Sequence, residues 1–379
     1  MKKMLSLAAM FAVLASASPA HAELKLSGDA GVRLRDVSYF SDADQLSLSN
    51  SASDDVVFQY RVRLNAAADL GDGYFFKALL QNEKLIYGDT PPNIIAAGGW
   101  QSVGYANTEE INVDVSNFYF GRMLEDCHYM VGRLPLNSFN NPIFDLAVYP
   151  SQPLSNPVFN INFDRVLGLN YGLKVGDGML NTTLVVLDNK VGDNTADDGD
   201  GLFNDGYALH LDYKVNVGNV TLEPQFLTIL TNSDIWTQDI RGAGYVVTEK
   251  VTPYTFGALI GVPAGDAKLT FGAFYTNCDD TTPNGGANVD YDGYLFRVKG
   301  EIGNFMAWYD FNRTTDDAND VKFTNHFVWA QYKIPVYSSA AGSITVQPTV
   351  RYLASKEDHT GYNVSGERLR SELWATVSF

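Results

Sequence analysis

Apolar and polar residues alternate along most of the chain, and this alternation limits the folds that the chain can adopt. Over residues 56–70, one face carries Phe58, Tyr60, Val62, Leu64 and Ala66, and the other carries Gln59, Arg61, Arg63 and Asn65. A period of two puts alternate side chains on opposite faces of a β-strand. The last ten residues, Arg370 to Phe379, repeat the pattern and end on an aromatic residue. The sequence therefore predicts an all-β protein built from amphipathic strands.

The first 22 residues have the three parts of a secretory signal peptide. Lys2 and Lys3 precede an apolar stretch from Leu5 to Ala15, and Ala20-His21-Ala22 forms an A-x-A cleavage site. The apolar stretch is too short to span a membrane as a helix, and residues 23–379 contain no apolar run of about eighteen residues. We predict a signal peptide over 1–22 and one exported domain over 23–379.

Short turns alternate with longer polar segments. Gly71-Asp72-Gly73 and Gly176-Asp177-Gly178 are examples of the short turns. Pairing the segments across such turns predicts sixteen strands, over 24–39, 56–70, 74–87, 111–123, 128–134, 165–175, 179–191, 207–217, 220–230, 252–262, 267–277, 292–302, 305–314, 321–336, 344–355 and 367–379. The long external segments are then expected at 41–55, 88–110, 192–206, 231–250, 279–291, 316–320 and 357–366.

An even number of amphipathic strands after a signal peptide is typical of a transmembrane antiparallel β-barrel. Closing the sheet pairs every edge, as lipid requires of backbone polar groups. A secreted β-sandwich or propeller would also alternate. The many arginines on the polar face and the asymmetry between short and long connections favour the barrel, because they fit a wet lumen.

The net charge is −17, and it becomes −19 once Lys2 and Lys3 leave with the signal peptide. This balance argues against nucleic-acid binding, which needs a basic surface. The two cysteines, Cys127 and Cys278, are expected near opposite ends of the barrel. A disulfide needs Cα atoms within about 7 Å, so we expect no bond between them.

One long segment, from Pro135 to Asp164, differs from the other loops. It contains five prolines, which oppose regular strand pairing. It also contains apolar side chains, among them Phe139, Ile143, Phe144 and Tyr149. A long loop with apolar side chains of its own should pack against the rest of the protein.

Three motifs and the closing strand resemble the trimeric general diffusion porins of Gram-negative outer membranes. The motifs are Phe120-Gly121-Arg122, Val131-Gly132-Arg133-Leu134-Pro135 and Asp164-Arg165. In that family the third loop, after strand five, folds into the pore and narrows it to an eyelet. A final aromatic residue, here Phe379, is part of the signal that the barrel-assembly machinery reads.

The resemblance implies a sixteen-stranded barrel in the outer membrane of a Gram-negative bacterium, with a constriction loop at about 135–163. It also implies a homotrimer in contact with lipid and lipopolysaccharide. The loop candidates are Phe144, Asp145 and Tyr149. The acidic eyelet signature of enterobacterial porins is absent, because Asp145 is the only acidic residue between Pro135 and Phe163.

The opposite side of the predicted lumen is basic. Alternation points seven arginines inward from strands 1, 2, 15 and 16, which are neighbours in a closed barrel: Arg33, Arg35, Arg61, Arg63, Arg351, Arg368 and Arg370. Arg122 and Arg133 are candidates to extend this set. Charges lining a pore bias its ion selectivity. The alternative for each arginine is a structural ion pair, with Asp29, Asp69 or Glu372 as candidate partners.

Other motifs carry less information. Asp193 to Gly201 resembles a calcium loop but lacks the glutamate at its twelfth position, so residues 192–206 are interpreted as an acidic external loop that divalent cations could visit. No G-x-S-x-G motif, phosphate loop or metal-ligand spacing occurs. We predict no enzyme activity, no cofactor and no metal site.

The sequence therefore predicts a porin that passes small hydrophilic solutes and ions by passive diffusion. One alternative is a solute-specific channel for a sugar or an anion. Another is a structural or adhesive barrel with an occluded lumen. The preference between cations and anions stays open, because the arginines and the acidic external loops favour opposite signs.

Overall fold

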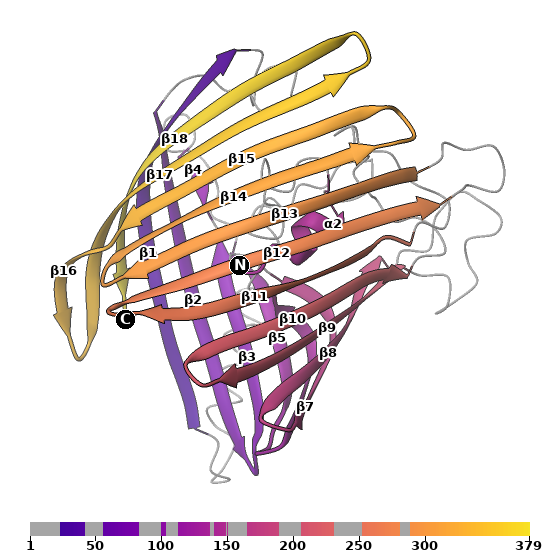
Figure 1. Cartoon of the computed structure of the whole chain (residues 1–379). Helices are drawn as coiled ribbons and strands as arrows, with labels where there is room; N and C mark the ends of the chain where they lie inside the picture. The colour runs from indigo at the N-terminus through magenta and orange to yellow at the C-terminus, as the bar shows by residue number, and fades with distance from the viewer. Residues whose placement is uncertain are drawn as a thin grey trace, which may run out of the picture.

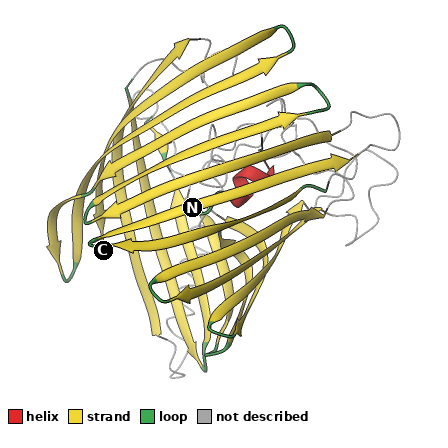
Figure 2. Ribbon diagram, in the orientation of Figure 1, coloured by secondary structure: helices red, strands yellow, loops and turns green. Residues whose placement is uncertain are grey.

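The computed structural model describes residues 23–41, 56–82, 100–103, 113–136, 140–148, 150, 165–188, 206–230, 252–280 and 289–379. The signal peptide predicted over 1–22 lies outside these residues. The described residues form one antiparallel sheet that closes on itself, with one short helix (Figures 1 and 2). No helix among them is long and apolar enough to cross a membrane.

The elements have the following bounds: β1 Glu23–Ser41, β2 Val57–Gly71, β3 Tyr74–Asn82, β4 Gln101–Ser102, β5 Val113–Met123, β6 Cys127–Pro135, α2 Ile143–Val148, β7 Arg165–Val175, β8 Gly178–Asp188, β9 Gly206–Val217, β10 Val220–Leu230, β11 Tyr254–Ala264, β12 Ala267–Asp280, β13 Val289–Ile302, β14 Phe305–Asp316, β15 Val321–Tyr332, β16 Ile334–Ser339, β17 Gly342–His359 and β18 Tyr362–Ser378.

These strands fill sixteen positions around the barrel, as the sequence predicts. We call each position a stave, because two of the positions are shared by two strands in line. β16 continues β15 after Lys333, and both pair with β17. β4 pairs with β2 beyond the end of β3, so β3 and β4 share one stave. The structure confirms the closed sixteen-strand antiparallel barrel.

The two ends of the chain close the barrel. β18 pairs with β1 from Asp29 opposite Ser378 to Ser41 opposite Gly366. Past β18, the backbone amide of Gly28 donates to the carbonyl of Phe379 (2.8 Å), and the amide of Phe379 donates back to Gly28 (3.0 Å). A Cβ on Gly28 would lie 2.8 Å from the Phe379 ring, so the bare glycine makes room for the terminal aromatic residue.

The tight turns lie where glycine and aspartate predict them. Between β2 and β3, Gly71, Asp72 and Gly73 have φ angles of 86°, 51° and 80°. Glycine adopts such angles without strain, and aspartate enters the left-handed region more readily than most other residues. A Cβ on Gly73 would also lie 2.2 Å from the carbonyl oxygen of Met123 on the next stave, so this turn packs closely against its neighbour.

The expected external loop over 357–366 is wrong. β17 continues to His359 and β18 begins at Tyr362, so only residues 360 and 361 form the turn. Asp358 is paired with Lys322 of β15, and Glu357 with Phe323. Polar residues can extend a strand beyond the membrane, where they need no apolar face, so the loss of alternation there did not end the strands.

The burial of side chains follows the pleat around the barrel. On β13 and β14, inward residues are buried while their neighbours are half-buried or exposed. The outward face carries exposed apolar side chains on every side, including Val32, Leu34, Val62, Phe118, Leu169, Phe256, Phe296, Tyr309, Val350 and Leu373. An apolar outer band around a closed sheet is the pattern of a barrel in lipid.

The two cysteines lie in described strands. Cys127 begins β6, and Cys278 lies in the last part of β12. They form no disulfide.

Candidate functional site

Seven arginines line one side of the lumen, on the four neighbouring strands β17, β18, β1 and β2. We call Arg33, Arg35, Arg61, Arg63, Arg351, Arg368 and Arg370 the basic wall. On β1 and β2 they alternate with the exposed residues Val32, Leu34 and Val62 and therefore point inward. Arg33, Arg351 and Arg368 are 3%, 3% and 5% exposed. The structure thus brings all seven arginines together.

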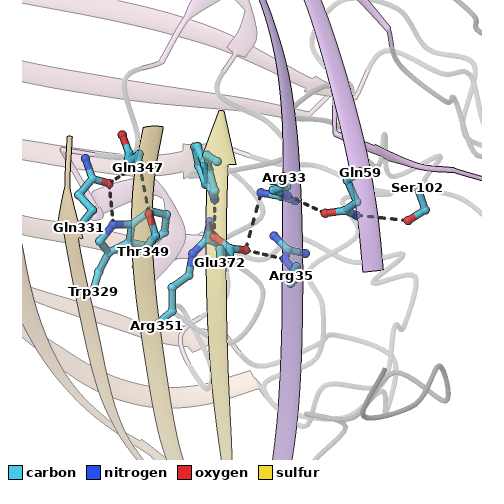
Figure 3. A network of polar contacts seen from close by, with 11 residues as sticks. Arg33, Arg35, Gln59, Ser102, Trp329, Gln331, Gln347, Thr349, Arg351 and Glu372 are labelled. Atoms are coloured by element: carbon cyan, nitrogen blue, oxygen red, sulfur yellow. Dashed lines mark hydrogen bonds and ion pairs between the residues drawn. The ribbon is translucent and has the colours of Figure 1, made fainter. Parts of the chain in front are cut away.

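Glu372 sits in the middle of the basic wall and contacts three of its arginines (Figure 3). Arg35 Nε lies 2.5 Å from Glu372 Oε1, and Arg351 Nη2 lies 2.8 Å from Oε2. Arg33 Nη1 is 3.8 Å from Oε1. The Trp374 indole N–H also donates to Oε2, at 3.0 Å. One carboxylate is therefore shared by three guanidinium groups.

A second carboxylate serves the β2 side of the wall. Arg63 lies 2.7 Å from Asp29, and Arg61 lies 3.5 Å from it. Asp29 and Glu372 were two of the three candidate partners from the sequence. The third, Asp69, instead accepts a hydrogen bond from the amide of Gly71 at its own turn. The seven arginines and these two carboxylates leave a formal charge of +5.

Tryptophans hold several of the guanidinium groups flat. The Arg351 guanidinium lies 3.7 Å from the ring centroid of Trp329, and Arg33 and Arg61 lie 4.4 and 4.6 Å from that of Trp100. Cation–π contacts of this kind stabilise a positive charge without neutralising it. Gln59 and Ser102 complete the set, because Arg33 Nε donates to Gln59 Oε1 at 2.6 Å and Gln59 donates to Ser102 Oγ at 3.3 Å (Figure 3).

Part of the predicted constriction loop lies inside the barrel, on another side of the lumen. α2 packs against β10, β11, β12 and β13 (Figure 1). Its residues Ile143, Phe144, Leu146 and Ala147 are at most 2% exposed and join an apolar cluster with inward side chains of the strands, such as Leu227, Ile229 and Leu295. We call this side of the lumen the anchor wall.

Polar contacts attach both flanks of α2 to the anchor wall. Lys299 donates to Asn140 at 2.8 Å, and Asn141 donates to Gln225 at 2.6 Å. Thr314 Oγ1 donates to the carbonyl oxygen of Pro150, at 2.6 Å. Phe144 meets the His210 ring edge-on, with centroids 5.3 Å apart. The described part of the loop is therefore fixed to the strands at several points.

The anchor wall also contains an arginine, but its surroundings differ. Arg297 of β13 and Asp310 of β14 form two hydrogen bonds of 2.6 Å each, and their side chains are 1% and 0% exposed. Trp308 Nε1 donates to the same carboxylate, at 3.1 Å. This bidentate pair matches one charge with one countercharge.

The other predicted residues lie elsewhere. Arg122 shares the outward face of β5 with Phe118 and Phe120, and its guanidinium stacks on Tyr74 beside the β2–β3 turn. Arg133 lies opposite Phe118, also on the outward face. The structure does not bring these two arginines into the basic wall. The apolar residues Phe118 and Phe120 could have shown from the sequence that Arg122 lies on the outward face of this strand.

Two of the three loop candidates, Phe144 and Asp145, lie among the described residues. Asp145 is 1% exposed on α2, the helix of the anchor wall. Phe144 is 2% exposed within the apolar cluster, so its ring is covered. Tyr149 lies outside the described residues. Sequence reasoning missed Trp100, Trp329 and Trp374. The inward positions of Trp329 and Trp374 follow from alternation along β15 and β18, whereas Trp100 falls in the segment 88–110 that the sequence predicts as an external loop.

Comparisons with known proteins give the fold a context. No protein-family model matches the sequence, and no curated protein matches it. An anion-selective porin from Comamonas acidovorans has a similar structure, with a TM-score of 0.54, 12% identity and coverage of 94% of this chain and 100% of that one.

Two further solved structures are similar. The outer membrane channel DcaP of Acinetobacter baumannii matches with a TM-score of 0.55 and 14% identity, covering 96% of this chain and 99% of its own. OmpT, an outer membrane protein of Vibrio cholerae in a trimer form, matches with a TM-score of 0.52 and 10% identity, covering 94% and 99%. The chain has the fold of the sixteen-stranded barrels of outer-membrane porins and channels.

Proposed function

We propose that the protein is an outer-membrane porin, a water-filled channel through which small hydrophilic solutes and ions diffuse passively. The observation that supports this most directly is the basic wall. The seven arginines carry more charge than Asp29 and Glu372 balance, and this excess needs water or ions around it, because unmatched charges are costly in a dry interior. The apolar outer band supports a position in a lipid bilayer.

The described part of the loop supports a constriction. It is attached to the anchor wall inside the barrel, so solutes would pass between it and the basic wall. The formal charge of +5 on the basic wall and its two carboxylates favours anions. We propose a preference for anions, with Arg33, Arg35, Arg61, Arg63, Arg351, Arg368 and Arg370 as the residues that set it.

The assembly and surroundings belong to the same proposal. A homotrimer is supported by the trimer form of the similar Vibrio protein. The exposed Phe379, joined to Gly28 at the seam, is the proposed signal for the barrel-assembly machinery. Lipid and lipopolysaccharide would surround the outer band. No reaction is proposed.

A solute-specific channel is the second candidate. The sequence offers Tyr39, Tyr60, Phe144 and Tyr149 as aromatic residues that would stack on a sugar. Phe144 is covered, however, and Tyr60 shares the outward face with Phe58 and Val62. The basic wall favours an anion over a sugar as the solute of such a channel.

Swelling of liposomes that contain the purified protein tests the proposal. A diffusion porin admits neutral sugars at rates that fall smoothly with solute size and do not saturate. Saturable uptake of one solute would favour the specific channel. No swelling with any small sugar would contradict the porin and favour an occluded, adhesive barrel.

A further inference from the structure

Two arginines of the basic wall lie directly opposite each other. Arg351 of β17 is the cross-strand partner of Arg370 of β18, and Arg368 lies two residues before Arg370 on the same inward face. Like charges directly opposite in a sheet destabilise it. A wall built only for stability would place an acid at one of these positions, as β13 and β14 do with Arg297 and Asp310.

Several N–H groups of this pair point at no acceptor in the described part of the chain. Arg351 is 3% exposed and uses Nη2 for Glu372, but its buried Nε and Nη1 atoms have no hydrogen-bond partner there. The buried Nε of Arg370 has none either. Buried donors without acceptors are unfavourable. The geometry therefore calls for an acceptor that comes from the lumen.

The contacts of the neighbouring Glu372 show that the arginines of this wall bind a carboxylate. Its carboxylate lies among Arg35, Arg351 and the Trp374 indole N–H. Guanidinium groups bind carboxylates and phosphates through two parallel hydrogen bonds, which suits them to such oxyanions more than to chloride. A solute carboxylate beside Arg351 and Arg370 would receive the contacts that Glu372 receives one step along the wall.

We propose that Arg351 and Arg370 form a binding subsite for the carboxylate or phosphate group of a small anionic solute. The inference rests on the proposed function, because the solute must enter through a water-filled lumen. Arg351 pairs with Glu372 through Nη2, but its Nε and Nη1 and the Nε of Arg370 have no acceptor in the described part of the chain, so these two arginines still have donors for a solute anion. Solutes with two negative charges bind it more tightly than solutes with one.

Block of single-channel chloride current in planar bilayers tests the subsite. Malonate, inorganic phosphate and acetate are added to wild type, Arg370→Gln and Arg63→Gln. Both variants lose one charge from the same wall, but Arg63 is paired with Asp29 and is therefore the matched control. Arg370→Gln weakens malonate block about ten-fold, the loss expected for one charge-assisted hydrogen bond, and Arg63→Gln changes it by less than about two-fold.

Further variants and solutes separate the charge of Arg370 from its geometry. Arg370→Lys keeps the positive charge but loses the two parallel N–H donors of the guanidinium. Malonate should therefore block this variant less tightly than wild type and more tightly than Arg370→Gln. Tighter block by malonate than by phosphate assigns the site to carboxylates, and the reverse order assigns it to phosphates. Equal effects of Arg370→Gln and Arg63→Gln would overturn the subsite, since only the general field would then act.

Measurements on the wild-type protein distinguish failure of the subsite from failure of the porin. Steady chloride conductance that none of the three oxyanions blocks would overturn the subsite and leave the porin standing. Absence of conductance would overturn the porin and, with it, the subsite.

Discussion

The two sides of the lumen use the same residue type in opposite ways. On the anchor wall, Arg297 and Asp310 form a buried one-to-one ion pair with two hydrogen bonds of 2.6 Å. On the basic wall, Arg351 shares Glu372 with Arg33 and Arg35 and lies opposite another arginine. An arginine that is matched by one carboxylate is part of the scaffold. Arginines that share one carboxylate keep a net positive charge that can attract a solute.

The two sides of the lumen also differ in what their apolar side chains contact. The anchor wall holds α2 through a cluster that includes Phe144, Leu227 and Leu295. On the basic wall, the aromatic residues Trp100, Trp329 and Trp374 lie against guanidinium groups. One side is built to hold a loop still, and the other is built to keep charges in place while they stay charged.

The largest expected effect comes from breaking the pair on the anchor wall. Asp310→Asn removes the carboxylate that forms two hydrogen bonds with the buried Arg297, so we expect the free energy of unfolding to fall by about 3–5 kcal/mol. Urea titration, followed by tryptophan fluorescence and by gel mobility of the folded barrel, measures this loss.

The control is Lys214→Gln. It breaks the pair between Lys214 and Glu223, in which Lys214 is 60% exposed and 3.7 Å from the carboxylate. That substitution should cost less than about 1 kcal/mol. Equal losses in both variants would mean that Arg297 is no more a scaffold residue than a surface lysine.

Phe144→Ala should release the loop without opening the barrel. Removing a buried phenylalanine costs about 3–5 kcal/mol where the site cannot collapse, and here that cost falls on the attachment of α2. Single-channel conductance should rise and fluctuate, because the loop leaves the anchor wall. Leu167→Ala, on the exposed outer face, is the control. Unchanged conductance in Phe144→Ala would show that the loop does not narrow the pore.

Glu372→Gln should sharpen the difference between the walls. It keeps the shape of the side chain and raises the formal charge of the seven arginines and two carboxylates from +5 to +6. A unit charge about 4 Å from a permeating ion is worth about 1 kcal/mol in water, so the preference for anions should rise by a few-fold at low salt. Reversal potentials measure it.

Asp177→Asn, in the exposed β7–β8 turn, removes the same charge far from the basic wall and is the control. If both variants shift the reversal potential equally, total charge sets the selectivity and the basic wall does not.

Trp374→Phe should have the smallest effect. It removes the indole N–H that donates to Glu372 at 3.0 Å but keeps an aromatic ring beside Arg33. We expect a loss of about 0.5–1.5 kcal/mol in the free energy of unfolding and little change in reversal potential. A shift as large as that of Glu372→Gln would mean that the indole N–H, and not the carboxylate, controls the wall.

Alternation in the sequence predicts the strands and the seven inward arginines because a period of two is a local property. It fails where the local rule is relaxed. The run from Glu357 to Gly366 is polar, yet it forms the ends of β17 and β18, because strands beyond the membrane need no apolar face.

Partnership inside the lumen depends on register, which the sequence does not give. Arg35 and Glu372 are 337 positions apart and meet only because β1 and β18 close the barrel. Asp29, Asp69 and Glu372 were equivalent candidates until the register placed two of them among the arginines. Trp329 and Trp374 were missed because an inward aromatic residue and a membrane-facing one differ only in strand parity. Trp100 was missed because its segment carries no alternation from which a strand could be predicted.

The most direct test of the account is the reversal potential of the wild-type channel in a planar bilayer under a tenfold gradient of potassium chloride. An open pore lined by the basic wall should give steady single-channel conductance and a reversal potential whose sign shows preference for chloride. A preference for potassium would contradict the role given to the basic wall, and a silent bilayer would contradict the channel itself.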